Sequence, residues 1–280
     1  MKNQINTYPS LTKSYKGFYP FKIGTTSFIF PDLYVPNVKM LGPFVDEIEL
    51  LLFESAPVAS LFSKPVIYDL KQLSQDLEVS YNIHLPTDIS ISDPSPAGRD
   101  QAVSSLMRVI ERIAPLAPVS YTLHVPYPSD ISNDDHLRNW QDVVYQNLAK
   151  IVGSGVRADK IAIETLDYPL ETLAEIIFEL QLSICLDAGH LLIHGYDIRR
   201  FFNKYGTKIT IMHLHGVKNN HDHLSLDQLP ADSMQSILQI LQTFTASLSL
   251  EVFAFKHLES SLQFFEKCWC LMRQPLDSPC

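Results

Sequence analysis

The chain has 280 residues, 46% of them hydrophobic, which suits one large domain with a sizeable core. Its 31 acidic and 22 basic residues give a net charge of −9, which argues against a nucleic-acid partner because phosphate backbones attract surfaces rich in Lys and Arg. No apolar run approaches the roughly 20 residues that a membrane-spanning helix needs, so we expect no membrane span.

Residues 1–20 precede the repeating pattern and are interpreted as an N-terminal extension, in which we find no apolar core of a signal peptide. The cysteines are too few and lie too near the C-terminus for a disulfide scaffold. We expect all of them to be reduced thiols in a cytoplasmic protein: Cys185, Cys268, Cys270 and Cys280.

Residues 21–280 are interpreted as one domain in which eight short apolar segments alternate with helix-like stretches. This alternation is typical of βαβ units and a parallel sheet. Eight units favour closure into a barrel, and the glycine-rich first turn of many open sheets is missing. We therefore predict an α/β fold, a (β/α)₈ TIM barrel, with strands at 21–28, 47–54, 80–86, 120–126, 160–166, 182–190, 209–216 and 248–253.

Helical periodicity fills several of the gaps between these segments. Apolar residues recur every three or four positions within 65–79, 100–114, 140–151 and 257–272. Gly153 and Gly155 act as stop signals after the third of these stretches. No linker or second domain interrupts the pattern.

Six of the expected strands end on a side chain that can bind a metal. A bulky apolar residue precedes each one and, because side chains alternate along a strand, it faces the helices while the ligand faces the barrel interior. Five of the six residues two positions before the ligands are small, which leaves room beneath them. Barrel enzymes carry their sites at the carboxyl ends of strands, so we predict one shared site: His84, His124, Glu164, Asp187, His213 and Glu251.

The segments after the sixth and seventh strands add further candidate ligands. His190 lies one turn beyond Asp187, and His223 lies in a loop after His213. Buried charges gathered in this way need a cation, and imidazole favours Zn²⁺, with Mn²⁺, Fe²⁺ and Co²⁺ as alternatives. Three neighbouring residues can be explained in two ways, as metal ligands or as parts of a solvated polar loop, and the sequence favours neither: His215, His221 and Asp222.

Two further sets of side chains are candidates with weaker support. On the second strand, Glu49 is interpreted as a structural pair partner and Glu54 as a candidate substrate contact. Aromatic residues in the loops after the first and fourth strands are candidates to line a substrate site, although ordinary packing explains them equally well: Phe28, Phe30, Tyr34 and Tyr127.

At these residues the chain resembles the xylose isomerase-like barrel superfamily, which contains sugar isomerases and endonuclease IV. The resemblance runs from about residue 21 to the last helix. It implies, for the sugar enzymes, a single metal held by two Glu, one Asp and one His, which here would be Glu164, Asp187, His213 and Glu251. The additional histidines resemble the three-metal set of endonuclease IV.

That second likeness implies two or three divalent metals per chain. The groups would be His84, His124 and Glu164; Glu164, Asp187, His213 and Glu251; and His190 and His223 with a further ligand. Endonuclease IV has an Asp two residues before the last His, where this chain has His221 beside Asp222. The sequence leaves the completion of the third group open.

The segment 23–54, IGTTSFIFPDLYVPNVKMLGPFVDEIELLLFE, is similar to the signature of the cobamide-remodelling phosphodiesterases, the CbiR family. The motifs that begin at His84, Asp187 and His213 (HLP, DAGH and HLHG) fit this family too. The resemblance implies a corrinoid substrate. It also implies hydrolysis of the nucleotide-loop phosphodiester of cobalamin-type cobamides, which yields cobinamide phosphate and the α-riboside of the lower base.

The expected catalytic residues are Glu164, Asp187 and Glu251, and the expected substrate contacts are Phe28, Tyr127 and His215. The first rival interpretation is a single-metal sugar isomerase or epimerase, which leaves His84 and His124 unexplained. The second is a DNA-repair endonuclease, which would need a basic groove. The third is a corrinoid-binding or metal-storage protein without turnover. The oligomeric state stays open.

Overall fold

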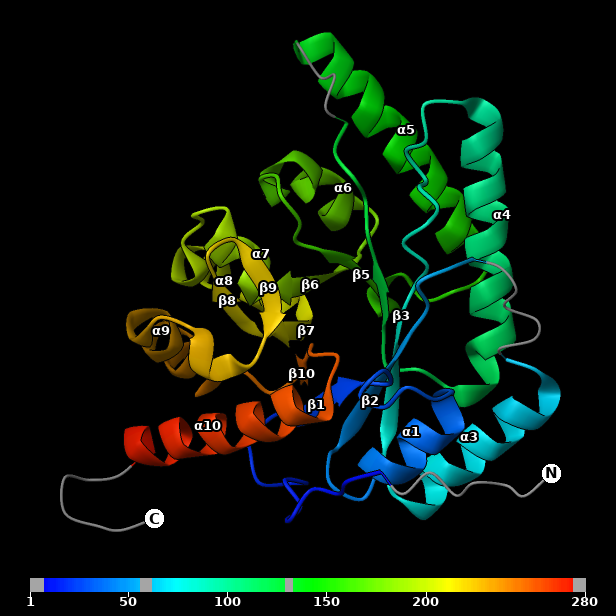
Figure 1. Cartoon of the computed structure of the whole chain (residues 1–280). Helices are drawn as coiled ribbons and strands as arrows, with labels where there is room; N and C mark the ends of the chain where they lie inside the picture. The colour runs from blue at the N-terminus through cyan, green and yellow to red at the C-terminus, as the bar shows by residue number, and fades with distance from the viewer. Residues whose placement is uncertain (1–7, 56–61, 129–132, 274–280) are drawn as a thin grey trace.

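The computed structural model describes residues 8–55, 62–128 and 133–273. Eight parallel strands close into a barrel in the order β1-β10-β7-β6-β5-β4-β3-β2, which confirms the predicted fold (Figure 1). The barrel strands are β1 (Lys22–Thr26), β2 (Glu47–Leu51), β3 (Ser80–His84), β4 (Tyr121–Leu123), β5 (Ile161–Glu164), β6 (Ser183–Asp187), β7 (Ile209–Leu214) and β10 (Ser247–Leu250).

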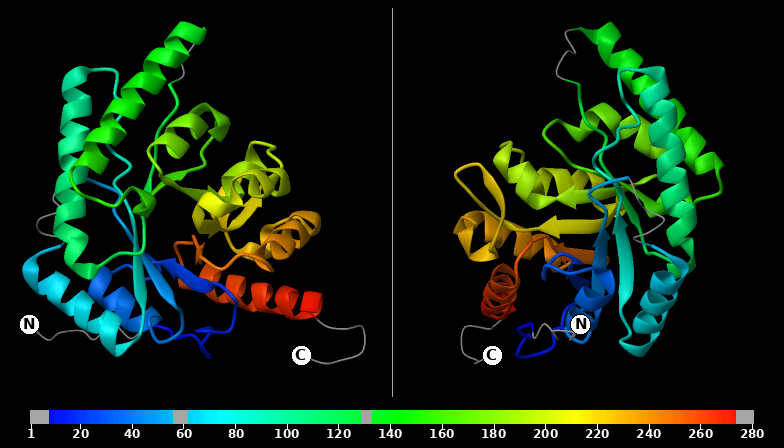
Figure 2. Two further views of the ribbon diagram at one scale, coloured as in Figure 1. Left: turned by 180° about the vertical axis from the view of Figure 1, so that it is seen from behind. Right: turned by 45° about the vertical axis from the view of Figure 1, so that its right-hand side comes forward.

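Helices surround the barrel, with α4 and α5 side by side on one flank and α10 lying across another (Figures 1 and 2). None of the described helices is long and apolar enough to cross a membrane. The helices are α1 (Tyr34–Leu41), α3 (Lys64–Asp76), α4 (Pro96–Ile113), α5 (Asp134–Gly153), α6 (Ala174–Glu179), α7 (Ala188–Ile193), α8 (Ile198–Tyr205), α9 (Ala231–Leu241) and α10 (Phe255–Arg273).

Local signals account for where the long helices begin. Ser95 accepts a hydrogen bond from the Gly98 amide at the start of α4, and Pro96 takes the first helical position. Asn133 accepts one from the His136 amide at the start of α5. The four predicted periodic stretches correspond to α3, α4, α5 and α10. All four helices begin before the predicted stretches, and α3 ends three residues earlier than predicted, at Asp76.

Two predicted loops are ordered elements instead. The segment after β1 contains α1, whose buried face includes Tyr34. The segment after β7 forms an antiparallel hairpin of β8 (Gly216–Lys218) and β9 (His221–Leu224). Asn219 and Asn220 join the two strands with φ of 53° and 60°, a left-handed pair that Asn tolerates and that matches the twist of a tight hairpin.

The barrel strands have two distinct faces, as the alternating pattern predicts. The bulky residues that precede the candidate ligands, such as Ile163 and Leu186, belong to the large core between strands and helices. Ala162, Cys185 and Ile211 form a separate buried cluster. These three belong to the inward-facing set, so the space beneath the ligands is lined by small and medium side chains.

The described part of the N-terminal extension packs against the amino end of the barrel. Tyr19 lies against Phe21, Phe265 and Trp269, with ring centroids 5.2–5.5 Å apart. The amide of Tyr15 donates to the carbonyl of Phe44, just before β2. Cys185, Cys268 and Cys270 form no disulfide within the described ranges, and Cys280 lies outside them.

Candidate metal centre

The barrel brings the six strand-end side chains together at its carboxyl end. His84, Glu164 and Asp187 are the last residues of β3, β5 and β6, while His124 and Glu251 directly follow β4 and β10. His213 is the next-to-last residue of β7. The side chains form two groups, and within each group the ligand atoms all lie within 4.8 Å of one another. The groups, which share the carboxylate of Glu164, are His84, His124 and Glu164; and Glu164, Asp187, His213 and Glu251.

Glu164 is the shared carboxylate, and it is 1% exposed. Its Oε2 lies 3.1 Å from His84 Nε2 and 2.8 Å from His124 Nε2. Its Oε1 lies 3.7 Å from His213 Nδ1 and 3.5 Å from His190 Nδ1. One oxygen of the carboxylate therefore faces each ligand group.

His213 is held from behind by a carboxylate. Its Nε2 lies 3.0 Å from Glu49 Oε1, and the hydroxyl of Ser249 donates to Glu49 Oε2 at 2.8 Å. Glu49 is thus a pair partner, and it directs His213 Nδ1 toward the shared site. Among the described residues, neither His213 Nδ1 nor Glu251 Oε2 has a hydrogen-bond partner, although the two buried atoms lie only 3.1 Å apart.

Asp187 links the site to the start of α7. Its Oδ1 accepts a hydrogen bond from the amide of His190 at 2.7 Å, so the candidate ligand is also the helix cap. The hydroxyl of Thr165 accepts a hydrogen bond from the Asp187 amide at 2.8 Å. The DAGH segment therefore places Asp187 and His190 on the same side of the site.

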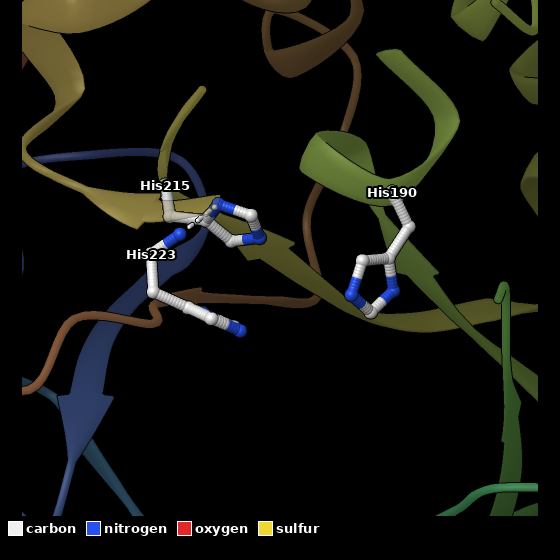
Figure 3. A group of neighbouring side chains, drawn as sticks. All are labelled: His190, His215 and His223. Carbon is white, nitrogen blue, oxygen red and sulfur yellow. Dashed lines mark hydrogen bonds between the residues drawn. The ribbon is translucent and has the colours of Figure 1, made fainter. Parts of the chain in front are cut away.

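A third group contains only histidines: His190, His215 and His223, whose ligand atoms lie within 4.8 Å of one another. Figure 3 shows His190 on α7 facing the other two, which lie side by side near the hairpin. His221 is exposed, and Asp222 Oδ1 lies 4.0 Å from His223 Nε2. The structure thus brings His215, rather than His221, close to His190 and His223.

Hydrogen bonds indicate which ring nitrogen of several histidines is available for a metal. The Nδ1 atoms of His84, His190 and His223 face the backbone carbonyls of Leu85, Thr165 and Glu251 at 3.0–3.1 Å. A proton on each Nδ1 leaves a lone pair on Nε2. His213 is arranged the other way, with Nδ1 available. Imidazoles held in this manner are typical of metal ligands, and together with the unpartnered atoms of His213 and Glu251 they fit a divalent cation.

The charges of the cluster oppose the effect of burial on its pKa values. Burial raises the pKa of the Glu164 carboxyl, but the charge and hydrogen bond of His124, the hydrogen bond of His84 and the nearby imidazole of His213 hold it well below its ordinary value. Burial lowers the pKa of His84, yet Glu164 and other carboxylates raise it to about 9. Without a cation, protons on histidine therefore balance the buried carboxylates.

The predicted aromatic contacts divide into two groups. Phe30 and Tyr34 pack in the core: Phe30 stacks on Phe255, and the Tyr34 hydroxyl donates to the Leu51 carbonyl at 2.7 Å. Both are buried, so of the two alternatives that the sequence left open the structure favours ordinary packing. Tyr127 is partly buried and stacks on Tyr168, so it remains a candidate.

Phe28 belongs to an aromatic rim beside the candidate metal centre. It contacts the exposed Phe53, which in turn contacts the exposed Phe253, with ring centroids 4.8 and 6.2 Å apart. Phe253 lies 4.9 Å from the ring of His223. We name Phe28, Phe53 and Phe253 the aromatic rim. Two of its members, Phe53 and Phe253, were not singled out from the sequence, although both lie within a few residues of a strand end.

Other predicted residues are placed differently from expectation. His215 is fully buried, which contradicts the substrate contact expected for it. Glu54 is exposed beside the aromatic rim. The sequence pattern identifies Cys185 only as a small interior residue, but its sulfur lies within 4.8 Å of ligand atoms of Glu164 and His213. Its position two residues before Asp187, on the same strand face, was the available signal.

Comparisons with known proteins agree with this architecture. The sequence model of one family, described as xylose isomerase-like TIM barrel, matches residues 38–268. Among proteins of curated function, none matches significantly.

Several solved structures are similar. A D-tagatose 3-epimerase-like protein has a TM-score of 0.71 and 19% identity over 89% of this chain and 99% of its own. The 3-keto-D-glucoside 4-epimerase YcjR of E. coli has a TM-score of 0.71 and 14% identity, covering 89% and 100%. The IOLI protein, solved with a zinc atom, has a TM-score of 0.69 and 16% identity, covering 88% and 96%. At such identities the likeness concerns the fold. The family match extends over most of the chain, which therefore belongs to the xylose isomerase-like TIM barrel family.

Proposed function

We propose that this protein is a metal-dependent phosphodiesterase that hydrolyses the nucleotide-loop phosphodiester of cobamides. The observation that carries the proposal is the position of Glu164 between two ligand groups, one of which contains His84 and His124. A single-metal sugar enzyme needs only the other group. The substrate assignment rests on the resemblance of segment 23–54 to the cobamide-remodelling phosphodiesterases.

Bound divalent metals, with Zn²⁺ as the first candidate, would supply Lewis acidity and lower the pKa of water. Two metals would be held by the groups that share Glu164, and a third is proposed at His190 and His223. Glu251 and Asp187 are proposed to orient the attacking water, because both carboxylates are buried at the site and have pKa values held below their ordinary range.

The products follow from addition of water across one P–O bond of the diester. Phosphate stays on the corrinoid as cobinamide phosphate, and the riboside of the lower base leaves with a hydroxyl group. The aromatic rim supports a large substrate with flat rings, since exposed aromatic side chains offer stacking surfaces. Tyr127 is a further proposed contact.

The test is incubation of metal-loaded protein with cobalamin, followed by chromatography and mass spectrometry of the corrinoids. Cobinamide phosphate that forms with wild type, and not with Glu164→Gln or after chelation, is the expected result. His194→Gln is the matched control, because His194 is exposed at the end of α7. Intact cobalamin after prolonged incubation with fully loaded enzyme would reject the substrate.

A sugar epimerase is the second candidate. The group of Glu164, Asp187, His213 and Glu251 supports it, because it would hold one metal between two carboxylates suited to proton transfer. Two of the named structural neighbours are also epimerases or epimerase-like. Exchange of a ketohexose C–H proton with deuterated solvent, with one metal equivalent per chain, would favour this candidate. Two or three equivalents would favour the phosphodiesterase.

A further inference from the structure

His215 lies where a third metal ligand would be expected, yet its hydrogen bonds point to another role. Its ring centroid is 4.4 Å from that of His223 and 6.1 Å from that of His190 (Figure 3). Proximity alone would therefore complete a three-histidine site. His215 can bind a metal only if one of its ring nitrogens has a free lone pair.

The first ring nitrogen of His215 is already an acceptor. The backbone amide of His223 donates to His215 Nδ1 at 3.0 Å, the bond drawn in Figure 3, and this contact is shorter than the 3.3 Å between the same Nδ1 and the carbonyl oxygen of Gly216. A backbone amide always carries its hydrogen, so this contact requires a lone pair on Nδ1 and places the ring proton of a neutral imidazole on Nε2. His223 has φ of 51°, a left-handed conformation that is costly for a residue other than glycine. Such strain is typical of a functional position.

The second nitrogen faces a carboxylate. His215 Nε2 lies 3.2 Å from Asp187 Oδ1 and 3.3 Å from Asp187 Oδ2. Both residues are 0% exposed, so water does not compete for this contact. With its proton on Nε2, His215 donates to Asp187 and has no lone pair left. The other histidines of the third group, His190 and His223, instead direct Nδ1 to backbone carbonyls and keep Nε2 available.

The backbone of the DAGH segment is shaped around the His215 ring. A Cβ atom at Gly189 would lie 2.0 Å from His215 Cε1 and 2.5 Å from its Nε2. Only glycine therefore allows the imidazole to lie against α7 and reach Asp187. This close approach gives a physical reason for glycine at the third position of the motif.

We propose that His215 is a positioning residue, which orients Asp187 for the metal group of Glu164, His213 and Glu251, and is not itself a metal ligand. The inference rests on the metal centre of the proposed function. It predicts that removal of the Nε2 donor weakens metal binding through Asp187, whereas replacement by another donor at the same place preserves it. Outer hydrogen-bonding partners of metal ligands typically contribute about 10–100-fold in affinity.

The test measures metal content and affinity in His215→Gln and His215→Leu. Glutamine keeps an N–H donor near the position of Nε2 but is a poor metal ligand, and leucine removes the donor. Zinc equivalents are counted by mass spectrometry after dialysis, affinities come from chelator competition, and visible spectra of the Co²⁺-loaded protein report the ligand field. His190→Asn serves as the ligand-loss reference and His194→Gln as the exposed control.

The proposal expects His215→Gln to keep the wild-type number of metal equivalents and the Co²⁺ spectrum. It expects His215→Leu to weaken binding about 10–100-fold. Loss of one equivalent in His215→Gln, matching His190→Asn, would overturn it, as would wild-type affinity in His215→Leu. If His215→Leu does not fold, the metal content and Co²⁺ spectrum of His215→Gln alone test the proposal. These readouts do not involve cobalamin, so failure of the cleavage assay would reject the substrate without affecting this inference.

Discussion

Substitution of Gly189 by alanine tests the packing on which the metal centre depends. The added Cβ would overlap the His215 ring, at 2.0 Å from Cε1, so the ring must move and its contact with Asp187 must break. Overpacking typically costs about 1–3 kcal/mol, and a hydrogen bond to a charged group contributes about 1.5–3 kcal/mol. Taken together, these two effects lead us to expect that Gly189→Ala lowers the free energy of unfolding by about 2.5–6 kcal/mol.

Urea unfolding followed by circular dichroism, in the presence of a chelator, measures this difference without a contribution from metal binding. Gly153→Ala is the matched control: Gly153 ends α5, and a Cβ atom added there would meet no described atom within 4 Å. That control is expected to be neutral or to stabilise by about 0.5–1 kcal/mol, because alanine restricts the unfolded chain.

A double-mutant cycle identifies the cause. Truncation of His215 to alanine removes the atoms that the new Cβ would meet, so Gly189→Ala should cost less than about 1 kcal/mol in that background. An equal cost of Gly189→Ala with and without the imidazole would refute the reasoning. Wild-type stability of the single variant would refute it too, because the backbone or ring would then have to yield freely.

Three further predictions concern the site and the extension. Glu49→Gln removes the charge behind His213, and we expect chelator competition to show about 10–100-fold weaker metal binding with little change in fold. In metal-free protein, the pKa of His84 is raised from an ordinary value of 6.5 to about 9. Protonated His84 therefore stabilises the folded state fully below pH 6.5, and this contribution is lost as the pH rises through 9. The free energy of unfolding should therefore fall between pH 6.5 and 9 by up to about 3 kcal/mol in the wild type, and it should fall less in a His84→Asn variant. An equal fall in the two proteins would argue against His84 as the source. Tyr19→Ala should cost about 3–5 kcal/mol in the same assay, whereas Tyr19→Phe should cost nothing, since the buried hydroxyl has no hydrogen-bond partner among the described residues; a large loss in Tyr19→Phe would reveal one.

Much of the fold could be predicted because its signals are local. Alternation of apolar residues along each strand fixes which side chains face inward, and this depends only on the two-residue repeat of an extended chain. Ile163 and Glu164 therefore occupy the expected opposite faces. The hairpin after β7 was missed, because two consecutive asparagines and a run of polar residues are equally typical of a solvated loop.

Periodicity and spacing within short segments were enough to establish the barrel and the set of side chains at its carboxyl end. The pairing of those side chains depends instead on packing between distant segments. Glu49 and His213 are 164 positions apart, and no local pattern relates them until barrel closure brings their atoms to 3.0 Å. The role of His215 depends in the same way on the His223 amide, on Asp187 and on the space above Gly189, which come together only when β7, the hairpin and α7 pack against one another.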